Sequence, residues 1–147
     1  MNTPAEEAAQ RKPARPLPHP TEVSRPFWDA CAKGSLSYQR CERCGIAIFP
    51  PQEFCPHDLS TDLRWREASG TGTVYSYTTV WRPQTPAFDV PYVVAVVELD
   101  EGPCMVTNII DCPHDKVTIG MPVEVAFREE EDGFWLPFFR PAGKEAG

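Results

Sequence analysis

The sequence predicts a mostly β protein in which a short N-terminal helix precedes a small cysteine-containing ribbon and a five-stranded barrel. Three observations lead to this prediction. Seventeen prolines among 147 residues, with apolar residues in short runs, disfavour a helical bundle. A Cys-x-x-Cys pair lies in the first third of the chain. Gly, Pro and Asp clusters divide the second half into five strand-length segments.

Composition also disfavours several classes of protein. No stretch approaches the roughly 20 consecutive apolar residues of a membrane helix, and the N-terminus lacks the apolar core of a secretory signal. We therefore expect a cytoplasmic protein, whose six cysteines act as metal ligands or buried thiols rather than disulfides. A net charge of −7, from 14 basic and 21 acidic residues, makes nucleic acid an unfavourable partner.

The two ends of the chain are predicted to lie outside the folded part. Residues 1–20 are Pro-rich and too poor in large apolar side chains to form a core, which predicts a disordered arm. Residues 142–147 form a short tail. The segment 21–35 is predicted to hold the N-terminal helix, with Ser24 as its N-cap and Gly34 as its stop.

Residues 36–66 form the candidate metal site. Cys41 and Cys44 make a Cys-x-x-Cys turn, and the following Gly45 permits the backbone geometry of a metal-binding knuckle. Redox motifs of this type normally begin a helix, and the Pro-ending run after Gly45 does not resemble one. A third thiol, Cys55, follows a proline-containing loop. Because the segment has few large apolar side chains for a core, we expect a structural zinc ion to crosslink it.

The fourth ligand of this site is ambiguous. A tetrahedral zinc site needs four donors, and the position where a second Cys-x-x-Cys pair would end is occupied by Asp58. Asp58 keeps the register, so its carboxylate is the favoured ligand. His57 is the alternative, and loss of the metal is the third possibility. A second CPHD stretch, at residues 112–115, has no Cys-x-x-Cys partner and is interpreted as a loop.

Residues 67–141 predict a barrel of the OB type. Five strand candidates are separated by turn signals, and residues 111–120 form the longer connection between the third and the fourth. Simple alternation along the first strand predicts that Thr73, Tyr75 and Tyr77 share one face of the sheet.

Taken together, these motifs resemble a known family. The order "PFWDACAKGSLSYQRCERCG", "FPPQEFCP", "ASGTGTVYSYTTVWRP", "PYVVAVVELDEG" and "IGMPVEVAF", over about residues 23–141, closely resembles a bacterial and archaeal family. That family joins an N-terminal helical segment and a rubredoxin-like zinc ribbon to an OB-fold. It was first catalogued as a domain of unknown function and is now described as acyl-CoA-associated. Asp58 departs from the family pattern, which usually has a fourth Cys there.

The resemblance implies an accessory role with zinc as a structural cofactor. Members look like partners of thiolase-like or lipid-transfer-protein-like catalytic subunits that act on acyl-CoA thioesters. The resemblance also implies that such a complex cleaves a carbon–carbon bond, by thiolysis or a retro-aldol reaction. The cleavage would belong to the degradation of an aromatic compound or a steroid side chain. The reactive residues are then expected on the partner, and none in this chain. Because the thiolase fold is generally dimeric, a heterotetramer is expected.

Two sets of side chains are candidates for contacts in such a complex. The aromatic set comprises Phe27, Trp28, Trp81, Phe88 and Tyr92. These rings either form a partner interface or pack against the chain's own core and barrel end. The basic set comprises Arg40, Arg43, Arg64 and Arg66. These guanidinium groups either bind the phosphates of CoA or form an ordinary solvated face.

Two other functions compete with the accessory role. An OB-fold can bind nucleic acid, but basic residues should then accompany the exposed aromatics, whereas "VELDEG" and "FREEEDG" are acidic. A free-standing enzyme would need a nucleophile and a base within reach, and Cys112 with His114 has no orienting third group in the sequence.

Overall fold

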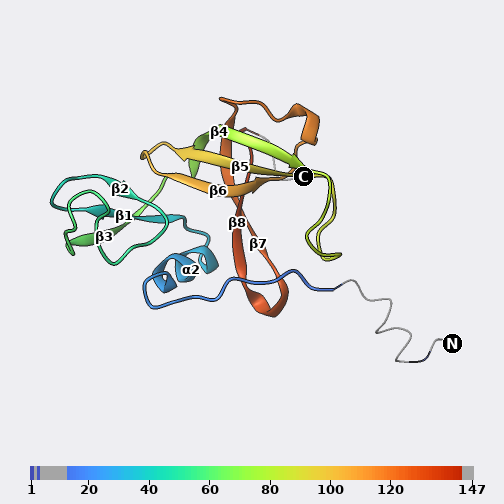
Figure 1. Ribbon diagram of the computed structural model, residues 1–147, viewed down its shortest axis with the longest axis horizontal. Coiled ribbons are helices and arrows are strands. Elements are labelled where there is room, and N and C mark those ends of the chain that lie inside the picture. Colours follow the sequence, from blue (N-terminus) through green and yellow to red (C-terminus); the bar gives the residue numbers. More distant parts are fainter. Residues whose placement is uncertain (2, 4–12, 144–147) are drawn as a thin grey trace.

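The computed structural model describes residues 1, 3 and 13–143. In chain order the elements are helix α2 (Arg25–Ala32), the short strands β1 (Ser37–Cys41), β2 (Ala47–Ile48) and β3 (Leu63–Glu67), and the barrel strands β4 (Thr71–Val80), β5 (Tyr92–Leu99), β6 (Cys104–Ile109), β7 (Pro122–Glu129) and β8 (Trp135–Pro141). The short 3-10 helices η1 (His114–Lys116) and η2 (Glu131–Gly133) lie in the last two connections. The predicted architecture of helix, ribbon and five-stranded barrel is confirmed (Figure 1).

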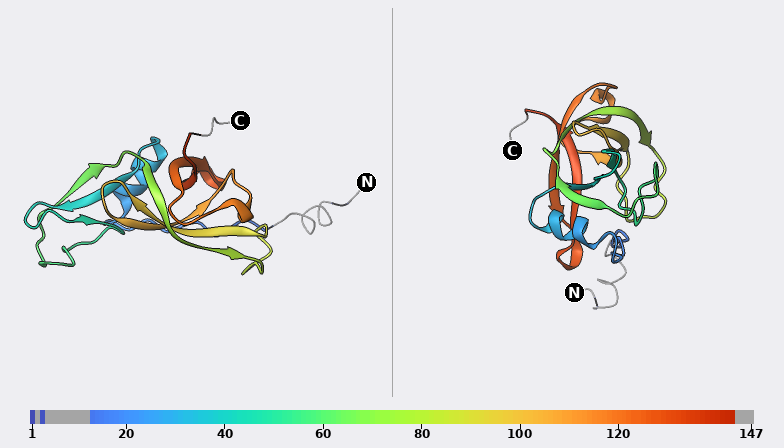
Figure 2. Two further views of the ribbon diagram at one scale, coloured as in Figure 1. Left: turned by 90° about the horizontal axis from the view of Figure 1, so that it is seen from above. Right: turned by 90° about the vertical axis from the view of Figure 1, so that its left-hand side faces the viewer.

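The ribbon and the barrel lie at opposite ends of an elongated molecule, with α2 beside the junction (Figures 1 and 2). Gly34 (φ +75°) stops helix α2 as predicted, two residues after its last residue, Ala32. The N–H of Ser35 donates to the Ala30 carbonyl (2.9 Å), and the N–H of Gly34 donates to the Cys31 carbonyl. These two bonds make a Schellman motif. Ser24 stands at the N-cap position, but its hydroxyl makes no bond to the helix and instead accepts from the N–H of Thr21.

The ribbon is a three-stranded antiparallel sheet in the order β2-β1-β3. Strands β1 and β2 are the two strands that flank the predicted knuckle. Strand β3 was not predicted, because its sequence, LRWRE, is short and carries three charged residues in five. It nevertheless pairs with β1 along its whole length, from Leu63 opposite Cys41 to Glu67 opposite Ser37.

The barrel closes in the order β4-β5-β6-β8-β7, and residues 111–120 connect its third and fourth strands as predicted. Val74, Val97, Val123 and Phe139 are almost completely buried inside it. Closure is uneven around the barrel. Strand β6 pairs with β5 through six residues, but it pairs with β8 through Ile109 and Phe139 alone.

A β-bulge in β4 overturns the predicted alternation of that strand. The register with β5 shifts between Val74 and Ser76, so side chains on either side of the bulge change face. Thr73 lies opposite the exposed Glu98, whereas Tyr77 lies opposite Ala95, which is 1% exposed and faces the core. Thr73 and Tyr77 therefore do not share a face, and the prediction was wrong because one extra residue breaks the period of two.

The N-terminal segment follows the barrel surface before it enters α2. Residues 2 and 4–12 of the predicted arm, and residues 144–147 of the predicted tail, lie outside the described residues. Residues 13–20 contain no helix or strand. Within them, Arg15 forms an ion pair with Glu130 and lies 5.9 Å from the ring centre of Phe138. The segment is thereby attached to the β7–β8 hairpin.

Candidate metal centre

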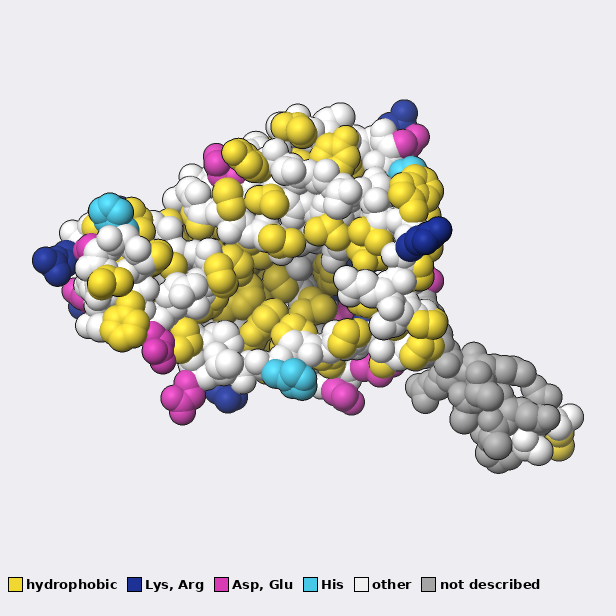
Figure 3. Space-filling model, viewed as in Figure 1, with side chains coloured by type: hydrophobic (Ala, Val, Ile, Leu, Met, Phe, Trp, Pro, Cys, Tyr) yellow, Lys and Arg dark blue, Asp and Glu magenta, His cyan; other side chains and the backbone are white. Residues whose placement is uncertain are grey.

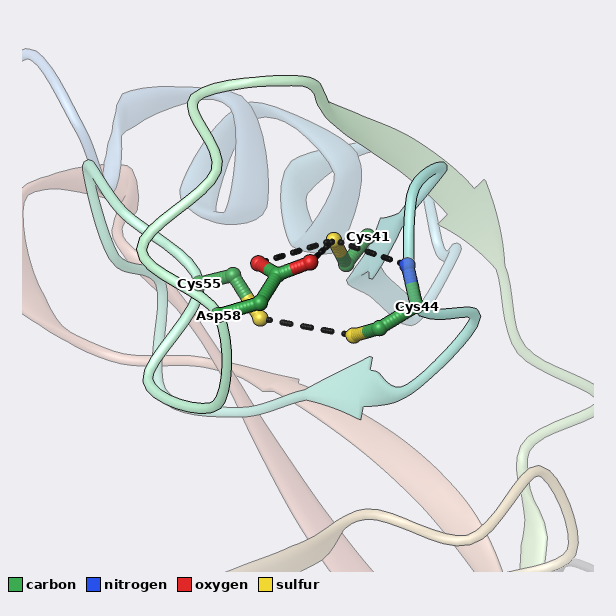
Figure 4. Close-up of side chains that lie close together, drawn as sticks. All are labelled: Cys41, Cys44, Cys55 and Asp58. Carbon is green, nitrogen blue, oxygen red and sulfur yellow. Dashed lines mark hydrogen bonds between the residues drawn. The ribbon is translucent and has the colours of Figure 1, made fainter.

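Four side chains of the ribbon converge on one point. Cys41 is the last residue of β1, Cys44 lies in the turn after it, and Cys55 and Asp58 lie in the loop between β2 and β3. Figure 4 shows the three sulfurs and the carboxylate pointing toward a common centre. One ligand atom from each of the four residues lies within 4.8 Å of those from the others. The sequence-predicted site is therefore assembled by two loops that the β1–β2 and β1–β3 pairings bring together.

The separations match those of a tetrahedral zinc site. Zn–S bonds of about 2.3 Å and a Zn–O bond of about 2.0 Å, at tetrahedral angles, place sulfurs about 3.8 Å apart and sulfur and oxygen about 3.5 Å apart. The Cys44 and Cys55 Sγ atoms are 3.6 Å apart, and Cys41 Sγ is 3.6 Å from Asp58 Oδ1. The donor set also suits zinc, which accepts both thiolate and carboxylate ligands.

The two loops have nearly the same backbone structure. In the first loop, the Gly45 N–H donates to the Cys41 carbonyl (2.8 Å); in the second, the Leu59 N–H donates to the Cys55 carbonyl (2.9 Å). Both fifth residues have positive φ, +79° for Gly45 and +61° for Leu59. Asp58 thus occupies in the second loop the position that Cys44 occupies in the first. This internal repeat explains why the carboxylate points to the sulfurs.

Backbone N–H groups create a favourable environment for negative charge at the centre. The Cys44 N–H, 3.5 Å from Cys41 Sγ, holds the pKa of Cys41 below its ordinary value. The Ser60 N–H donates to Asp58 Oδ1 (2.9 Å) and lowers the pKa of Asp58, with a smaller contribution from Arg43. Burial acts in the opposite direction on Cys55 and raises the pKa of its thiol to about 11.

The four side chains would carry more negative charge than they can hold without a bound cation. Three thiolates and one carboxylate bring four negative charges, against two positive charges on zinc, and thiolates require a cation when they are buried. Arg43 Nε lies 4.0 Å from Asp58 Oδ2 and supplies a further positive charge at the edge. A zinc ion held by Cys41, Cys44, Cys55 and Asp58 would crosslink the two loops.

The alternative ligands lie elsewhere. His57 is exposed to solvent and does not join the cluster. In the second CPHD stretch, Cys112 makes a contact with the Pro113 carbonyl, and His114 lies edge-on against the ring of Trp81, with centroids 5.0 Å apart. This stretch forms the connection that contains η1, as the sequence predicted for a loop.

The aromatic candidates do not form one patch. Phe27 is 3% exposed and packs in the core against Trp28 and Phe49, so it offers almost no surface to a partner. Trp28 is half-buried and lines a cavity beside α2. Phe88 and Tyr92 lie 5.8 Å apart, centroid to centroid, and line a second cavity near Arg15. Trp81 is 63% exposed.

Three of the basic candidates lie on the ribbon sheet, where Arg40 and Arg64 are opposite each other on β1 and β3, and Arg43 lies in the turn after β1. Three of the four guanidinium groups already face carboxylates. Arg66 pairs with Glu42 (2.8 Å), Arg64 with Asp62 (3.7 Å) and Arg43 with Asp58 (4.0 Å). These pairs reduce the positive potential on this sheet, and binding of CoA phosphates here stays a prediction.

No helix among the described residues is long and apolar enough to cross a membrane.

The fold and the site define a class of protein in which a zinc ribbon, built from two knuckles, is followed by an OB barrel. Family comparison gives the same assignment. Residues 28–64 match the family model "ChsH2, rubredoxin-like zinc ribbon domain", and residues 65–128 match "ChsH2, C-terminal OB-fold domain". The chain belongs to this ChsH2/DUF35 family.

Several known proteins are similar to this chain. It is 44% identical over 138 residues to a "Probable enoyl-CoA hydratase alpha subunit" of Thermomonospora curvata, covering 92% of this chain and 43% of that protein. It is 41% identical over 97 residues to a "DUF35 domain-containing scaffold protein" of Methanocaldococcus jannaschii, covering 64% and 69%. A solved chain described as "Ltp2-ChsH2(DUF35) aldolase" shares 43% identity at a TM-score of 0.79, covering 86% and 99%. The chain thus spans less than half of the hydratase relative.

Proposed function

We propose that this chain is a non-catalytic subunit of a complex in which a thiolase-like or lipid-transfer-protein-like partner acts on an acyl-CoA thioester. The observation that carries the proposal is the similarity to the ChsH2(DUF35) chain described with an Ltp2 aldolase. The similarity extends over 99% of that chain at 43% identity. The reaction class is carbon–carbon bond cleavage, by thiolysis or by a retro-aldol step, on an aromatic or steroid-derived substrate. A heterotetramer of two copies of each subunit is the expected assembly.

The side chains of this subunit favour a structural role over a catalytic one. Three cysteines belong to the metal cluster, and burial raises the pKa of Cys31 to about 12, so that thiol is a poor nucleophile at neutral pH. His114 is packed against Trp81 rather than against a cysteine or a hydroxyl. A reaction on a thioester needs a nucleophile, a base and an oxyanion site in one place, and we assign these groups to the partner.

The zinc ribbon has a structural purpose in this proposal. Its own apolar core consists of little more than Cys41, Ile48 and Cys55, with Leu63 beside them. So small a cluster cannot hold the two cysteine-containing loops, and a metal crosslink replaces the missing apolar contacts on this side of the ribbon, whose other side packs against the main core. The ribbon then acts as a rigid extension of the barrel that widens the surface available to a partner.

A second candidate is that the chain serves a hydratase. The observation that favours it is the 44% identity, over 92% of this chain, to a probable enoyl-CoA hydratase alpha subunit. In that case a separate hydratase domain would be the partner, and the substrate class would still be an acyl-CoA. Nucleic-acid binding by the barrel is disfavoured, because the net charge is −7 and several arginines are paired with carboxylates.

The test is co-purification. The tagged chain is expressed together with a thiolase-like subunit from the same organism, and separately with a hydratase-like subunit. Each eluate is analysed for a stoichiometric complex and for zinc. We expect a stable complex with the thiolase-like subunit and about one zinc per copy of this chain. The proposal would be refuted if the chain eluted without a partner in both co-expressions. A complex with the hydratase-like subunit only would establish the second candidate.

A further inference from the structure

We propose that the catalytic partner inserts an extended, uncharged peptide segment into the hollow between β6, β8 and α2, where it pairs with the free edge of β6. The inference rests on the proposed function, because it names the surface by which this chain holds its partner. The surface is distinct from the metal centre: it is formed by the barrel, the helix and the residues after β2.

The first observation is that the barrel has an open seam. The N–H of Ile110 donates to the Phe139 carbonyl (2.8 Å), which directs the backbone of Ile110 toward β8. Alternate residues of a strand direct their N–H and C=O groups to the same side. The backbone groups of Val106 therefore also face away from β5 and toward the gap. The only β6–β8 residue pair in the described structure is Ile109 with Phe139, at the far end of β6.

The opposite side of the seam cannot close it. Phe139 faces β6, so Pro137, two residues earlier in β8, faces the same gap. Proline has no N–H and cannot complete a ladder, which is why it occurs at free strand edges. Pro137 therefore cannot donate a hydrogen bond to β6, and the pairing of β6 with β8 does not extend beyond Ile109 toward the N-terminal part of β6.

The second observation is the hollow itself, a cavity of about 510 Å³ along this seam. Its lining includes Phe27, Trp28 and Phe49 on one side and Val106, Leu136 and Pro137 on the other. Among the described residues that line it there is no Lys, Arg, Asp or Glu, and His19 is the one titratable side chain. Figure 3 shows this hollow at the centre of the molecule, lined by hydrophobic side chains, with most charged groups at the periphery.

The third observation is that β6 lacks the usual protection of a free edge. Free edges are normally guarded by lysines, by proline, by a bulge or by a covering segment, since they otherwise recruit another strand. The sequence of β6, CMVTNI, contains no charge and no proline, and its pairing with β5 contains no bulge. Val106 is 69% exposed. The N-terminal segment covers one end of the hollow with Pro18 and His19 and leaves the rest open.

These properties identify the occupant. Free backbone N–H and C=O groups pair with another peptide backbone, which is the mode of recognition called strand addition. An uncharged lining in a chain of net charge −7 gives no counter-charge to phosphates, so nucleic acid and the nucleotide portion of CoA are unsuitable. A second copy of this chain is also unsuitable, because its own β6 edge lies inside the same hollow and two recessed edges do not meet. An apolar extended segment of the partner satisfies both the edge and the walls.

The experiment compares matched variants in the co-purified complex. Val106→Lys places a charge at the edge, and Ile119→Lys is its control, because the two aliphatic side chains have nearly equal exposure, 69% and 72%, and Ile119 does not line the hollow. Val106→Pro removes the N–H that faces the gap while leaving the pairing with β5 intact. We expect both Val106 variants to weaken partner binding by at least about tenfold, because a desolvated charge or a lost strand pair costs more than 1.4 kcal/mol, and Ile119→Lys to bind like the wild type.

Hydrogen exchange of the unaltered chain provides an independent measurement, because it needs no substitution that could itself affect folding. We expect the amide of Val106 to become protected when the partner binds. Failure of the wild type to bind any partner would contradict the proposed function, whereas wild-type binding that survives both Val106 variants, with no new protection in β6, would overturn the docking site alone. A chain that is dimeric by itself, and that Val106→Lys makes monomeric, would assign the seam to a second copy and would also overturn the inference.

Discussion

Asp58 is the residue on which the zinc site can be tested most sharply. It is the one oxygen ligand among three sulfurs, and the sequence places a histidine directly before it. Three variants separate the possibilities. Asp58→Ala removes the fourth donor, Asp58→Cys replaces the carboxylate by a thiolate, and His57→Ala removes the alternative ligand.

The magnitude follows from the geometry of the cluster. The Asp58 Oδ1 atom stands 3.6 Å from Cys41 Sγ, at the separation expected of two ligands of one zinc ion. Structural zinc sites bind with about 10–16 kcal/mol, so one of four donors contributes on the order of 3 kcal/mol. Replacement of Asp58 by alanine, with water as the fourth ligand, is therefore expected to weaken zinc binding about 100-fold.

The other two variants have opposite expectations. Asp58→Cys is expected to bind zinc at least as tightly as the wild type, because the two loops share one backbone structure and a cysteine at this position copies Cys44. His57→Ala is expected to leave affinity unchanged within about twofold, because His57 is exposed and lies outside the cluster.

The assay is a competition titration of the purified chain against a chromogenic chelator of known zinc affinity, at several pH values between 6 and 8. Burial raises the pKa of Cys55 to about 11, so its proton must leave when zinc binds. Affinity should therefore increase with pH for every variant. If Asp58→Ala bound zinc as tightly as the wild type, or if His57→Ala lost as much affinity as Asp58→Ala, the assignment of Asp58 would be wrong.

Three further predictions concern the thiols and the barrel. In the zinc-loaded chain, Ellman's reagent should react with the exposed Cys104 but not with the buried Cys31, because burial raises the pKa of Cys31 to about 12. A strong chelator should then release the three thiols of the metal cluster, and release of fewer would mean an incomplete site. Gly72→Ala should destabilise the fold by about 3 kcal/mol, since a Cβ there would overlap a carbonyl oxygen of β5, whereas Gly34→Ala, at positive φ but in open space, should cost about 1 kcal/mol; chemical denaturation checks both. Thr107→Val should stabilise the chain by about 1 kcal/mol, because it removes a buried hydroxyl that has no hydrogen-bond partner in the described structure, and a lower melting temperature would contradict this.

Local sequence determined much of this protein. The spacing of Cys41 and Cys44, with Gly45 after them, specifies a knuckle because a tight turn aims both sulfurs at one point and needs a residue that tolerates positive φ. Gly34 ends α2 for the same conformational reason. The five barrel strands and their long third connection follow from apolar runs separated by turn residues. Each of these features depends on residues within a few positions of one another.

Other features were decided by contacts between distant segments. Strand β3 exists because β1 offers it a complete set of partners, although its own sequence is highly charged. The bulge in β4 follows from the register with β5, and it reverses the face of Tyr77. The sequence favoured Asp58 over His57 by register alone. Only the structure shows that the second loop repeats the backbone of the first, because Leu59 adopts the positive φ that Gly45 adopts in the first loop.

The open seam of the barrel belongs to the same class. Neither β6 nor β8 reveals by its own sequence that the two strands meet at a single residue pair, because strand pairing joins backbones more than 25 positions apart. The local pattern specifies which residues prefer a strand and which face is apolar. Partner, register and the point where pairing stops are set by the simultaneous packing of the whole barrel, which no short stretch of sequence contains.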